Sequence, residues 1–235
     1  NLDKLKILIK TLSTSQLVSF DLETTSLQPL IADIVGLSFC TKPNEGWYIP
    51  VVYPEKNENL FDDFSINIIL EELKPLFENP EVKFCGQNLK YDALILSRYN
   101  INIENIYFDS MVAEHLLHPE KNSYKLDHLS IDYLGYYMVP IEDLIGKGKN
   151  QGSMSDVPLA IISDYAIEDA DIALQVCHKQ ITLLKEDGLI EYFFSIEMPL
   201  LKVLLSIEKN GVHVDINFLS LLSKNVTLEI DQLTH

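Results

Sequence analysis

Three short runs of β-branched and aromatic residues lie near the N-terminus, at residues 17–22, 32–40 and 47–52. Clusters of Pro, Asn and Gly separate them, and such clusters mark turns between strands. Three consecutive strands with short connections predict an antiparallel meander. Two shorter runs, at 82–85 and 106–108, predict further strands.

The remainder of the chain has helical periodicity. Apolar residues recur at helical spacing, which predicts helices at 66–77, 89–99, 110–117, 126–134 and 158–185. A polar Gly/Lys/Asn segment at 146–153 predicts a loop before the last of these helices. A strand-rich first half followed by a helix-rich second half is typical of an α/β fold with a mixed central sheet.

A domain boundary is expected near residue 190. Gly188 is a typical helix stop, and a new amphipathic pattern runs from Ile196 to Asn210. We therefore predict one domain at 1–190 and the helical, truncated start of a second at 191–235. The second segment is too short to close a core of its own, so its helices are expected to pack on the first domain.

The formal net charge of the 235 residues is −17. A protein that holds nucleic acid mainly by charge has a surplus of Lys and Arg, so this composition argues against such a protein. Part of the excess negative charge is accounted for if several acids bind divalent cations at one site.

The cysteines and the apolar runs indicate the setting in which the chain folds. Cys40, Cys85 and Cys177 have apolar neighbours and no metal-ligand spacing, which indicates reduced core thiols and a cytoplasmic location. No apolar run approaches the roughly 20 residues of a membrane helix, so no membrane association is expected. A monomer is expected.

Three short segments place carboxylates where they could meet. Asp21 and Glu23 alternate along a predicted strand and therefore share one face. Asp92 follows Asn88, which can cap the helix that begins there. A tyrosine and an acid four residues apart share a face of the long predicted helix, namely Tyr165 and Asp169. Crowded carboxylates repel unless a cation lies between them, and hard oxygen ligands suit Mg²⁺ or Mn²⁺.

Each segment alone has a plainer interpretation. Asp21 and Glu23 could form a solvated strand edge, since isolated D-x-E patterns are common. Asp92 could be an exposed first-turn acid favoured by the helix dipole. Tyr165 could be a core residue beside a surface Asp169. The three segments together are more specific than any one of them.

Taken in order, FDLET, GQNLKYD and YAIEDAD resemble the three exonuclease motifs of the DEDD superfamily, in its tyrosine-containing branch. Among its members, the chain is most similar to the 3′-to-5′ proofreading exonuclease domains of bacterial-type family A DNA polymerases. GKGKNQ at 146–151 resembles a loop of that family, and 196–215 resembles the start of its polymerase region.

The resemblance implies a ribonuclease-H-like fold, a mixed β-sheet flanked by α-helices, with a C-terminal helical extension. It implies two divalent ions, Mg²⁺ with Mn²⁺ or Zn²⁺ possible, at Asp21, Glu23, Asp92 and Asp169, and Tyr165 positioning the attacking water. The implied activity is removal of nucleotides from DNA 3′ ends by two-metal-ion hydrolysis. The implied partners are a single-stranded or frayed 3′ end and the polymerase domain of the same parent chain.

The family comparison also points to residues that contact the substrate strand. They are Thr24, Leu27, Gln87, Asn88, Lys90 and Tyr91. Leu27 could instead be ordinary core, and Lys90 an ordinary solvated residue. Two positions depart from the family: Ile141 stands where an aromatic residue often stacks on a base, and Ser123 where an arginine of the strand channel falls. These departures predict a weak hold on isolated single strands.

Two other functions remain open. A 3′-to-5′ exoribonuclease could use the same acids, because they do not read a 2′-hydroxyl. A catalytically silent structural module of a polymerase is the other alternative, although all four acids and the tyrosine are present. Glu168 is expected to bond locally, Asp109–Ser110 to cap a helix, and the histidines to lie outside the mechanism.

Overall fold

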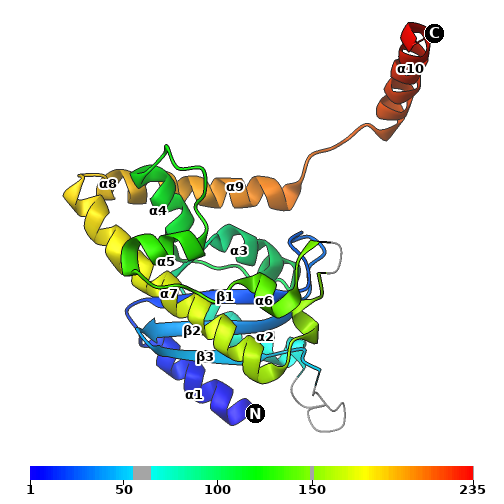
Figure 1. The fold of residues 1–235 in the computed structure, drawn as a ribbon. Helices are drawn as coiled ribbons and strands as arrows, with labels where there is room; N and C mark the ends of the chain where they lie inside the picture. Colours follow the sequence, from blue (N-terminus) through cyan, green and yellow to red (C-terminus); the bar gives the residue numbers. More distant parts are fainter. Residues whose placement is uncertain (55–64, 149–150, 235) are drawn as a thin grey trace.

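The computed structural model describes residues 1–54, 65–148 and 151–234. Its centre is a five-stranded sheet with the order β3-β2-β1-β4-β5 (Figure 1). The strands are β1 (Val18–Thr24), β2 (Ile34–Lys42), β3 (Glu45–Pro50), β4 (Phe84–Gly86) and β5 (Ile106–Asp109). The expected α/β class is confirmed.

The first three strands form the predicted meander. β1 pairs with β2, and β2 with β3, in antiparallel fashion. β4 and β5 then extend the sheet beyond β1 in parallel, which makes it mixed. β1 therefore occupies the centre of the sheet.

The helices and helical turns are α1 (Leu2–Ser13), α2 (Ile66–Phe77), α3 (Leu89–Arg98), α4 (Ser110–Leu117), α5 (Leu126–Leu134), α6 (Ile141–Ile145), the 3-10 turn η2 (Met154–Asp156), α7 (Leu159–Glu186), α8 (Ile190–Tyr192), the π-helical turn η3 (Phe193–Glu197), α9 (Met198–Asn210) and α10 (Ile216–Thr234). The predicted helices at 66–77, 110–117 and 126–134 are confirmed at the same residues. In the predicted loop at 146–153, Lys149 and Asn150 lie outside the described residues.

The two faces of β1 carry different chemistry. Phe20 points into a cluster of rings, 5.3 Å from the Phe77 ring of α2 and 5.6 Å from the Phe84 ring of β4. Asp21 and Glu23 point to the opposite face, because side chains alternate along a strand. The long helix α7 crosses that opposite face and packs on β1, β2 and β3 (Figure 1).

Helix α1 has no counterpart among the predicted elements. Its buried residues Leu5, Leu8 and Leu12 follow helical spacing and join the core cluster beside α2. The Asn1 side chain caps it by accepting from the Lys4 N–H at 3.0 Å. A helix of this length is marginal alone, so its packing on α2 stabilises it.

The C-terminal segment packs on the first domain only in part. Met198 and Leu201 of α9 are buried, and α9 packs on α3 and β5. Helix α10, in contrast, has no buried residue and projects away from the body (Figure 1). The expectation that 191–235 pack as helices on the first domain is therefore wrong for α10, because none of its side chains is buried against that domain.

Two further predictions concern the cysteines and membrane-spanning helices. Cys40, Cys85 and Cys177 are unpaired and buried, as predicted for core thiols. Among the described residues, no helix combines the length and the apolar character needed to cross a bilayer.

Candidate active site

Three carboxylates from two elements converge beside the central strand. Asp21 and Glu23 stand on β1, and Asp169 on α7. One carboxylate oxygen from each lies within 4.8 Å of the others. The predicted sharing of a face by Asp21 and Glu23 thus brings both acids against the helix that carries Asp169.

Asp92 reaches the same centre from α3. Its side chain is only 2% exposed, and one of its oxygens accepts from the backbone N–H of Leu22 at 3.2 Å. Leu22 lies between Asp21 and Glu23, so this bond ties the first turn of α3 to the acidic stretch of β1. Asp92 is therefore not the exposed first-turn acid of the plainer interpretation.

The start of α3 is capped by a residue that is distant in sequence. Asn88 occupies the cap position but adopts left-handed backbone angles, and its side chain makes no capping bond, so the predicted cap is wrong. The Asp109 carboxylate accepts from the N–H of Leu89 at 2.7 Å and of Asn88 at 3.3 Å. It also accepts from Met111 at 2.9 Å, at the start of α4. Asp109 thus caps two helices at once, and its expected role as a cap is confirmed.

Burial and mutual repulsion raise the pKa values of the four carboxyl groups. Burial raises the pKa of Asp21 from 3.8 to about 6. Burial, followed by the charges of Asp21, Asp169 and Asp92, raises the pKa of Glu23 well above its ordinary value. Burial and then Asp21 do the same for the pKa values of Asp92 and Asp169. Without a cation, these groups resist carrying their charges together.

One atom in the cluster lacks a partner. Oε1 of Glu23 is buried and accepts no hydrogen bond from the described residues. A buried carboxylate oxygen is costly to leave unpaired. Since the donors are carboxylate oxygens in a crowded group, they fit a hard divalent cation such as Mg²⁺ or Mn²⁺.

Tyr165 lies one turn before Asp169 on α7, and its hydroxyl hydrogen-bonds the Asp169 carboxylate. Burial, then the charges of Asp169, Glu23 and Asp21, raise the pKa of Tyr165 far above its usual range. The phenol therefore keeps its proton and is available as a donor next to the acids.

A cleft of about 280 Å³ opens onto the acids. Asp21, Tyr165 and Asp169 line one part of it, and Gln87 and Ile141 line another. Sequence reasoning did not single out two further lining residues, Lys125 and Asp127. The signal available for them was their place at the start of the predicted helix at 126–134.

The six residues expected to contact substrate lie in different places. The Thr24 and Tyr91 hydroxyls are 2.7 Å apart, and Tyr91 also bonds the Ser26 carbonyl. Leu27 is 91% exposed and is therefore not core.

The other three divide between two pockets. Gln87 lines the acid cleft. Asn88 and Lys90 instead line a smaller cavity of about 120 Å³ against α9, where Lys90 pairs with Glu208.

Neighbouring residues support the cluster without belonging to it. Glu168 accepts from the Tyr136 hydroxyl at 2.7 Å and from the Val139 N–H at 2.9 Å, which confirms its expected local role.

Tyr48 of β3 has a buried hydroxyl without a hydrogen-bond partner among the described residues, and the charge of Glu23 helps to raise its pKa. A Cβ on Gly36, which pairs with Glu23 across β1 and β2, would overlap that hydroxyl.

Comparison with known proteins places this geometry in a family. A model of the 3′-5′ exonuclease family matches residues 1–184. DNA polymerase I of Pseudomonas aeruginosa is 32% identical over 222 residues, 93% of this chain and 24% of that protein. DNA polymerase I of Borreliella burgdorferi is 35% identical over 218 residues, 90% of this chain and 22% of that protein. The chain thus spans about a quarter of the length of the curated relatives it matches.

Solved structures share the fold. The POL domain of Pol1 from M. smegmatis, in complex with DNA primer-template and dNTP, gives a TM-score of 0.75 at 16% identity, covering 97% of this chain and 34% of that one. Brucella melitensis NrnC with bound Mg²⁺ gives a TM-score of 0.64 at 13% identity, covering 87% of this chain and 91% of that one. The ribonuclease-H-like fold expected from the motifs is confirmed. The chain belongs to the 3′-5′ exonuclease family of hydrolytic nucleases, in the form in which the domain occurs in DNA polymerase I.

Proposed function

We propose that the domain removes nucleotides from DNA 3′ ends by two-metal-ion hydrolysis, as the proofreading exonuclease of a DNA polymerase I. The observation that carries this proposal is the convergence of Asp21, Glu23 and Asp169, with a buried Glu23 oxygen left unpaired. Such a group is costly to maintain unless cations bind to it.

The family resemblance supplies the assignment of metal ligands. Asp21, Glu23 and Asp169, which lie together, would hold one divalent ion, and Asp21 and, through water, Asp92 would hold the second. Mg²⁺ would be the natural ion, with Mn²⁺ or Zn²⁺ as substitutes. When bound, such a pair of ions lowers the pKa of water and neutralises charge on both the attacking and the leaving oxygen. The relatives' family uses divalent metals, and one structural neighbour was solved with Mg²⁺.

Tyr165 orients the water that attacks the terminal phosphodiester. Its hydroxyl already bonds Asp169, and its raised pKa keeps the phenolic proton in place. Tyr165 therefore acts by hydrogen bonding and not as a proton acceptor. Asp92 joins β1 to α3 by accepting from the Leu22 N–H, which holds it beside the acids of β1.

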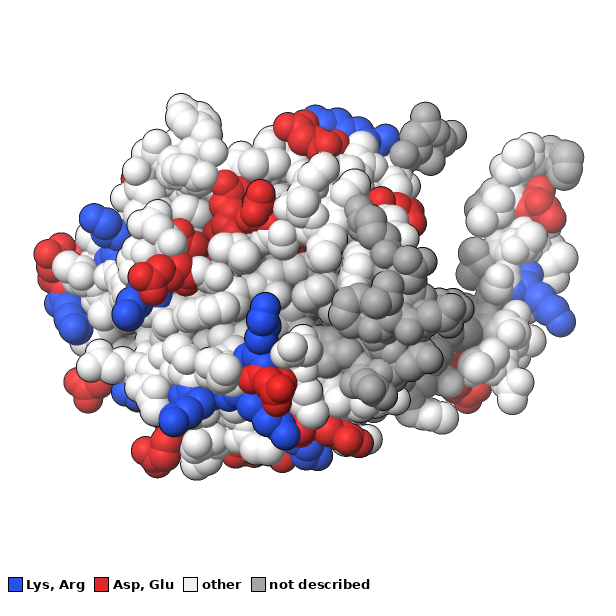
Figure 2. Space-filling view, turned by 90° about the horizontal axis from the view of Figure 1, so that it is seen from below, with Lys and Arg blue, Asp and Glu red and all other residues white. Residues whose placement is uncertain are grey.

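The substrate is the 3′ end of a single-stranded or frayed DNA. Leu27 is an apolar side chain exposed just beyond β1, which suits contact with a terminal base. Thr24, Gln87 and Tyr91 lie near the acid centre, while Asn88 and Lys90 would meet the strand farther along, beside α9. On the face shown in Figure 2, positive and negative side chains are interspersed, so this face presents no broad basic surface.

The domain boundary is placed near residue 190, so that 1–190 form the exonuclease and 191–235 begin the polymerase domain of the same parent chain. The family match ends at residue 184 and α8 begins at Ile190, which supports this division. A cytoplasmic monomer completes the proposal.

The experiment that tests this function follows DNA and RNA strands of one sequence, each labelled at its 5′ end, with Mg²⁺ or Mn²⁺. A DNA duplex with a mismatched 3′ end is degraded in parallel. Stepwise shortening of DNA from the 3′ end supports the proposal. Faster shortening of RNA selects the exoribonuclease instead. No shortening, although Mn²⁺ binds, points to the silent structural module or to a hold on DNA that needs the polymerase domain.

A further inference from the structure

A DNA phosphate that enters the acid cleft would meet the proposed metal ions and the charged side chains that line the cleft. Three of its lining residues are acids, namely Asp21, Asp127 and Asp169. The single Lys or Arg among the described residues that line it is Lys125. The cations of the proposed function would offset the charges of Asp21 and Asp169, and Lys125 is the one lining side chain that adds a positive charge of its own.

We infer that Lys125 contacts a backbone phosphate of the substrate strand within the cleft. This inference rests on the proposed function, because it assumes that the cleft holds a nucleic acid strand. It assigns the contact to a residue that lies two positions beyond Ser123.

Lys125 is exposed and has no carboxylate partner among the described residues. Three other lysines are engaged by carboxylates. Lys121 pairs with Glu114 and Asp132, each at 2.7 Å, Lys90 pairs with Glu208, and Lys147 pairs with Glu142 at 3.0 Å. The charge of Lys125 is thus available to a ligand, whereas theirs is compensated.

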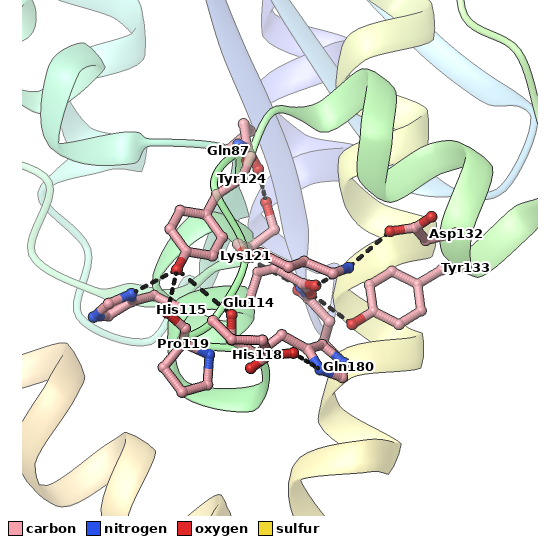
Figure 3. Close-up of polar contacts among 12 residues, drawn as sticks. Gln87, Glu114, His115, His118, Pro119, Lys121, Tyr124, Asp132, Tyr133 and Gln180 are labelled. Carbon is pink, nitrogen blue, oxygen red and sulfur yellow. Dashed lines mark hydrogen bonds and ion pairs between the residues drawn. The ribbon is translucent and has the colours of Figure 1, made fainter.

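A hydrogen-bonded network fixes the backbone beside Lys125. The Gln87 amide donates to the Tyr124 carbonyl at 2.7 Å, and the Gln87 carbonyl oxygen bonds the Ser110 hydroxyl. The Tyr124 hydroxyl lies 3.1 Å from Nδ1 of His115 and 3.3 Å from the Pro119 carbonyl. Figure 3 shows Gln87, Tyr124, His115 and Pro119 bonded around the loop. The loop is therefore attached to α4 and to Gln87, which directly follows β4, immediately before Lys125.

The buried carboxylate of Glu114 lies at the centre of this network. Glu114 has no exposed surface and accepts from Lys121, from the Tyr133 hydroxyl at 2.5 Å and from the Gln180 amide at 2.9 Å (Figure 3). Gln180 stands on α7, the helix that carries Tyr165 and Asp169. The network thus fixes the Lys125 backbone relative to the catalytic helix, so less conformational entropy is lost when a phosphate binds.

The test measures binding of a 5′-fluorescein DNA single strand by anisotropy, with Mg²⁺ and a hydrolysis-resistant phosphorothioate at the 3′-terminal linkage. Lys125→Ala should raise Kd about fivefold at low salt. It should also lower the slope of log Kd against log salt by about 0.7, which is the change expected when one phosphate contact of a single strand is lost. Lys125→Arg should restore most of the affinity, because the positive charge remains. The matched control is Lys179→Ala, an exposed lysine on α7 about 15 Å along the helix from Asp169, at 1.5 Å per residue. It should bind as the unmodified chain does.

A double-mutant cycle then identifies the phosphate. Strands are made with one neutral methylphosphonate at each of the last few linkages in turn. At one linkage, the substitution should weaken binding to the unmodified chain but have no further effect on Lys125→Ala. Additive effects at every linkage, or an unchanged salt slope, would overturn the inference.

The outcome is separate from that of the proposed function. If the unmodified chain binds the strand but does not shorten an unprotected one, the exonuclease proposal fails, and the cycle still decides whether Lys125 contacts phosphate. If the strand is shortened and the cycle is additive, only the inference fails.

Discussion

The backbone N–H of Leu22 donates a 3.2 Å hydrogen bond to the Asp92 carboxylate, across 70 positions of sequence. This bond joins the acidic stretch of the central strand to the first turn of α3. Asp92 thereby lies beside the centre formed by Asp21, Glu23 and Asp169, although it is distant from all three in sequence. Asp92 is thus a structural acceptor as well as a proposed metal ligand, and the two roles can be separated.

Asp92→Asn should separate them, because the amide keeps an oxygen that can accept from Leu22 while it loses the charge. We expect hydrolysis of a DNA strand to fall at least about a hundredfold, since a metal ligand is lost. The free energy of unfolding without metal should stay the same or rise, because repulsion with Asp21 is relieved. Single-turnover kinetics and chemical denaturation in a chelator measure the two effects. Unchanged hydrolysis would contradict the role of Asp92 in the metal site.

The acids predict an unusual dependence of stability on pH in the absence of metal. Because folding raises the pKa of Asp21 from 3.8 to about 6, the folded state binds more protons than the unfolded state in this range. The contribution of Asp21 to stability is therefore present below the unfolded value and lost as pH rises through the folded one. Glu23, Asp92 and Asp169 shift in the same direction.

Thermal unfolding measured in a chelator should accordingly show a melting temperature that decreases from about pH 4.5 to pH 7. Millimolar Mg²⁺ should remove much of that decrease, since cations stabilise the charged carboxylates. Asp169→Asn should reduce both the decrease and the response to Mg²⁺. A melting temperature that is indifferent to pH and to Mg²⁺ would count against cation binding at this cluster.

Tyr165→Phe removes the hydroxyl that bonds Asp169 but leaves the ring in place. We expect kcat to fall about ten- to a hundredfold, as for a lost positioning contact. Binding of Mn²⁺, followed by calorimetry, should remain close to that of the unmodified chain, because the four carboxylates are retained. A parallel loss of Mn²⁺ affinity and kcat would indicate that Tyr165 only organises the acids.

Asp109→Ala should destabilise the fold by about 2 kcal/mol, since Asp109 caps both α3 and α4 and one cap contributes about 1 kcal/mol. Asp164→Ala, an exposed acid on α7 without a capping role, serves as the control and should change stability little. Urea denaturation of both variants measures the difference. Equal stability of the two variants would show that other groups cap these helices.

Gly36→Ala should cost about 1–3 kcal/mol of stability through overpacking. The added Cβ would overlap the buried Tyr48 hydroxyl, directly across the strand pair from Glu23. Gly152→Ala is the matched control, because its Cβ would meet only ordinary contact at 3.6 Å from the Ile145 carbonyl. Denaturation curves measure both changes, and a Gly36→Ala variant as stable as the control would show that Tyr48 moves aside freely.

The sequence predicted well those features of the fold and the site that depend on local residue pattern. The helix at 66–77 follows from apolar spacing, and the shared face of Asp21 and Glu23 follows from strand alternation alone. The motifs supplied the order of the four acids, but only the fold brings β1, α3 and α7 together. Helix α1 was missed because a short amphipathic segment is stable only when a partner covers it.

The errors come from contacts that are distant in sequence. Asn88 is the residue type expected of a cap, yet Asp109 makes the capping bonds from 21 positions away in the chain. The exposure of Leu27 and the pairing of Lys90 with Glu208 contradict no prediction, but they too depend on tertiary placement and could not be read from the sequence. Lys125 could not be identified from a motif, because its place in the cleft depends on how the loop before α5 is held by Gln87 and α4.

The most direct test of the account compares four chains on one 5′-labelled DNA strand with Mg²⁺: the unmodified protein, Asp21→Ala, Asp169→Ala and the control Asp164→Ala. We predict shortening from the 3′ end by the unmodified protein and the control, and a rate at least about a thousandfold lower in the two cluster variants, the several kcal/mol that bound metal supplies. Comparable shortening by all four chains would contradict the assignment of hydrolysis to the carboxylates of β1 and α7.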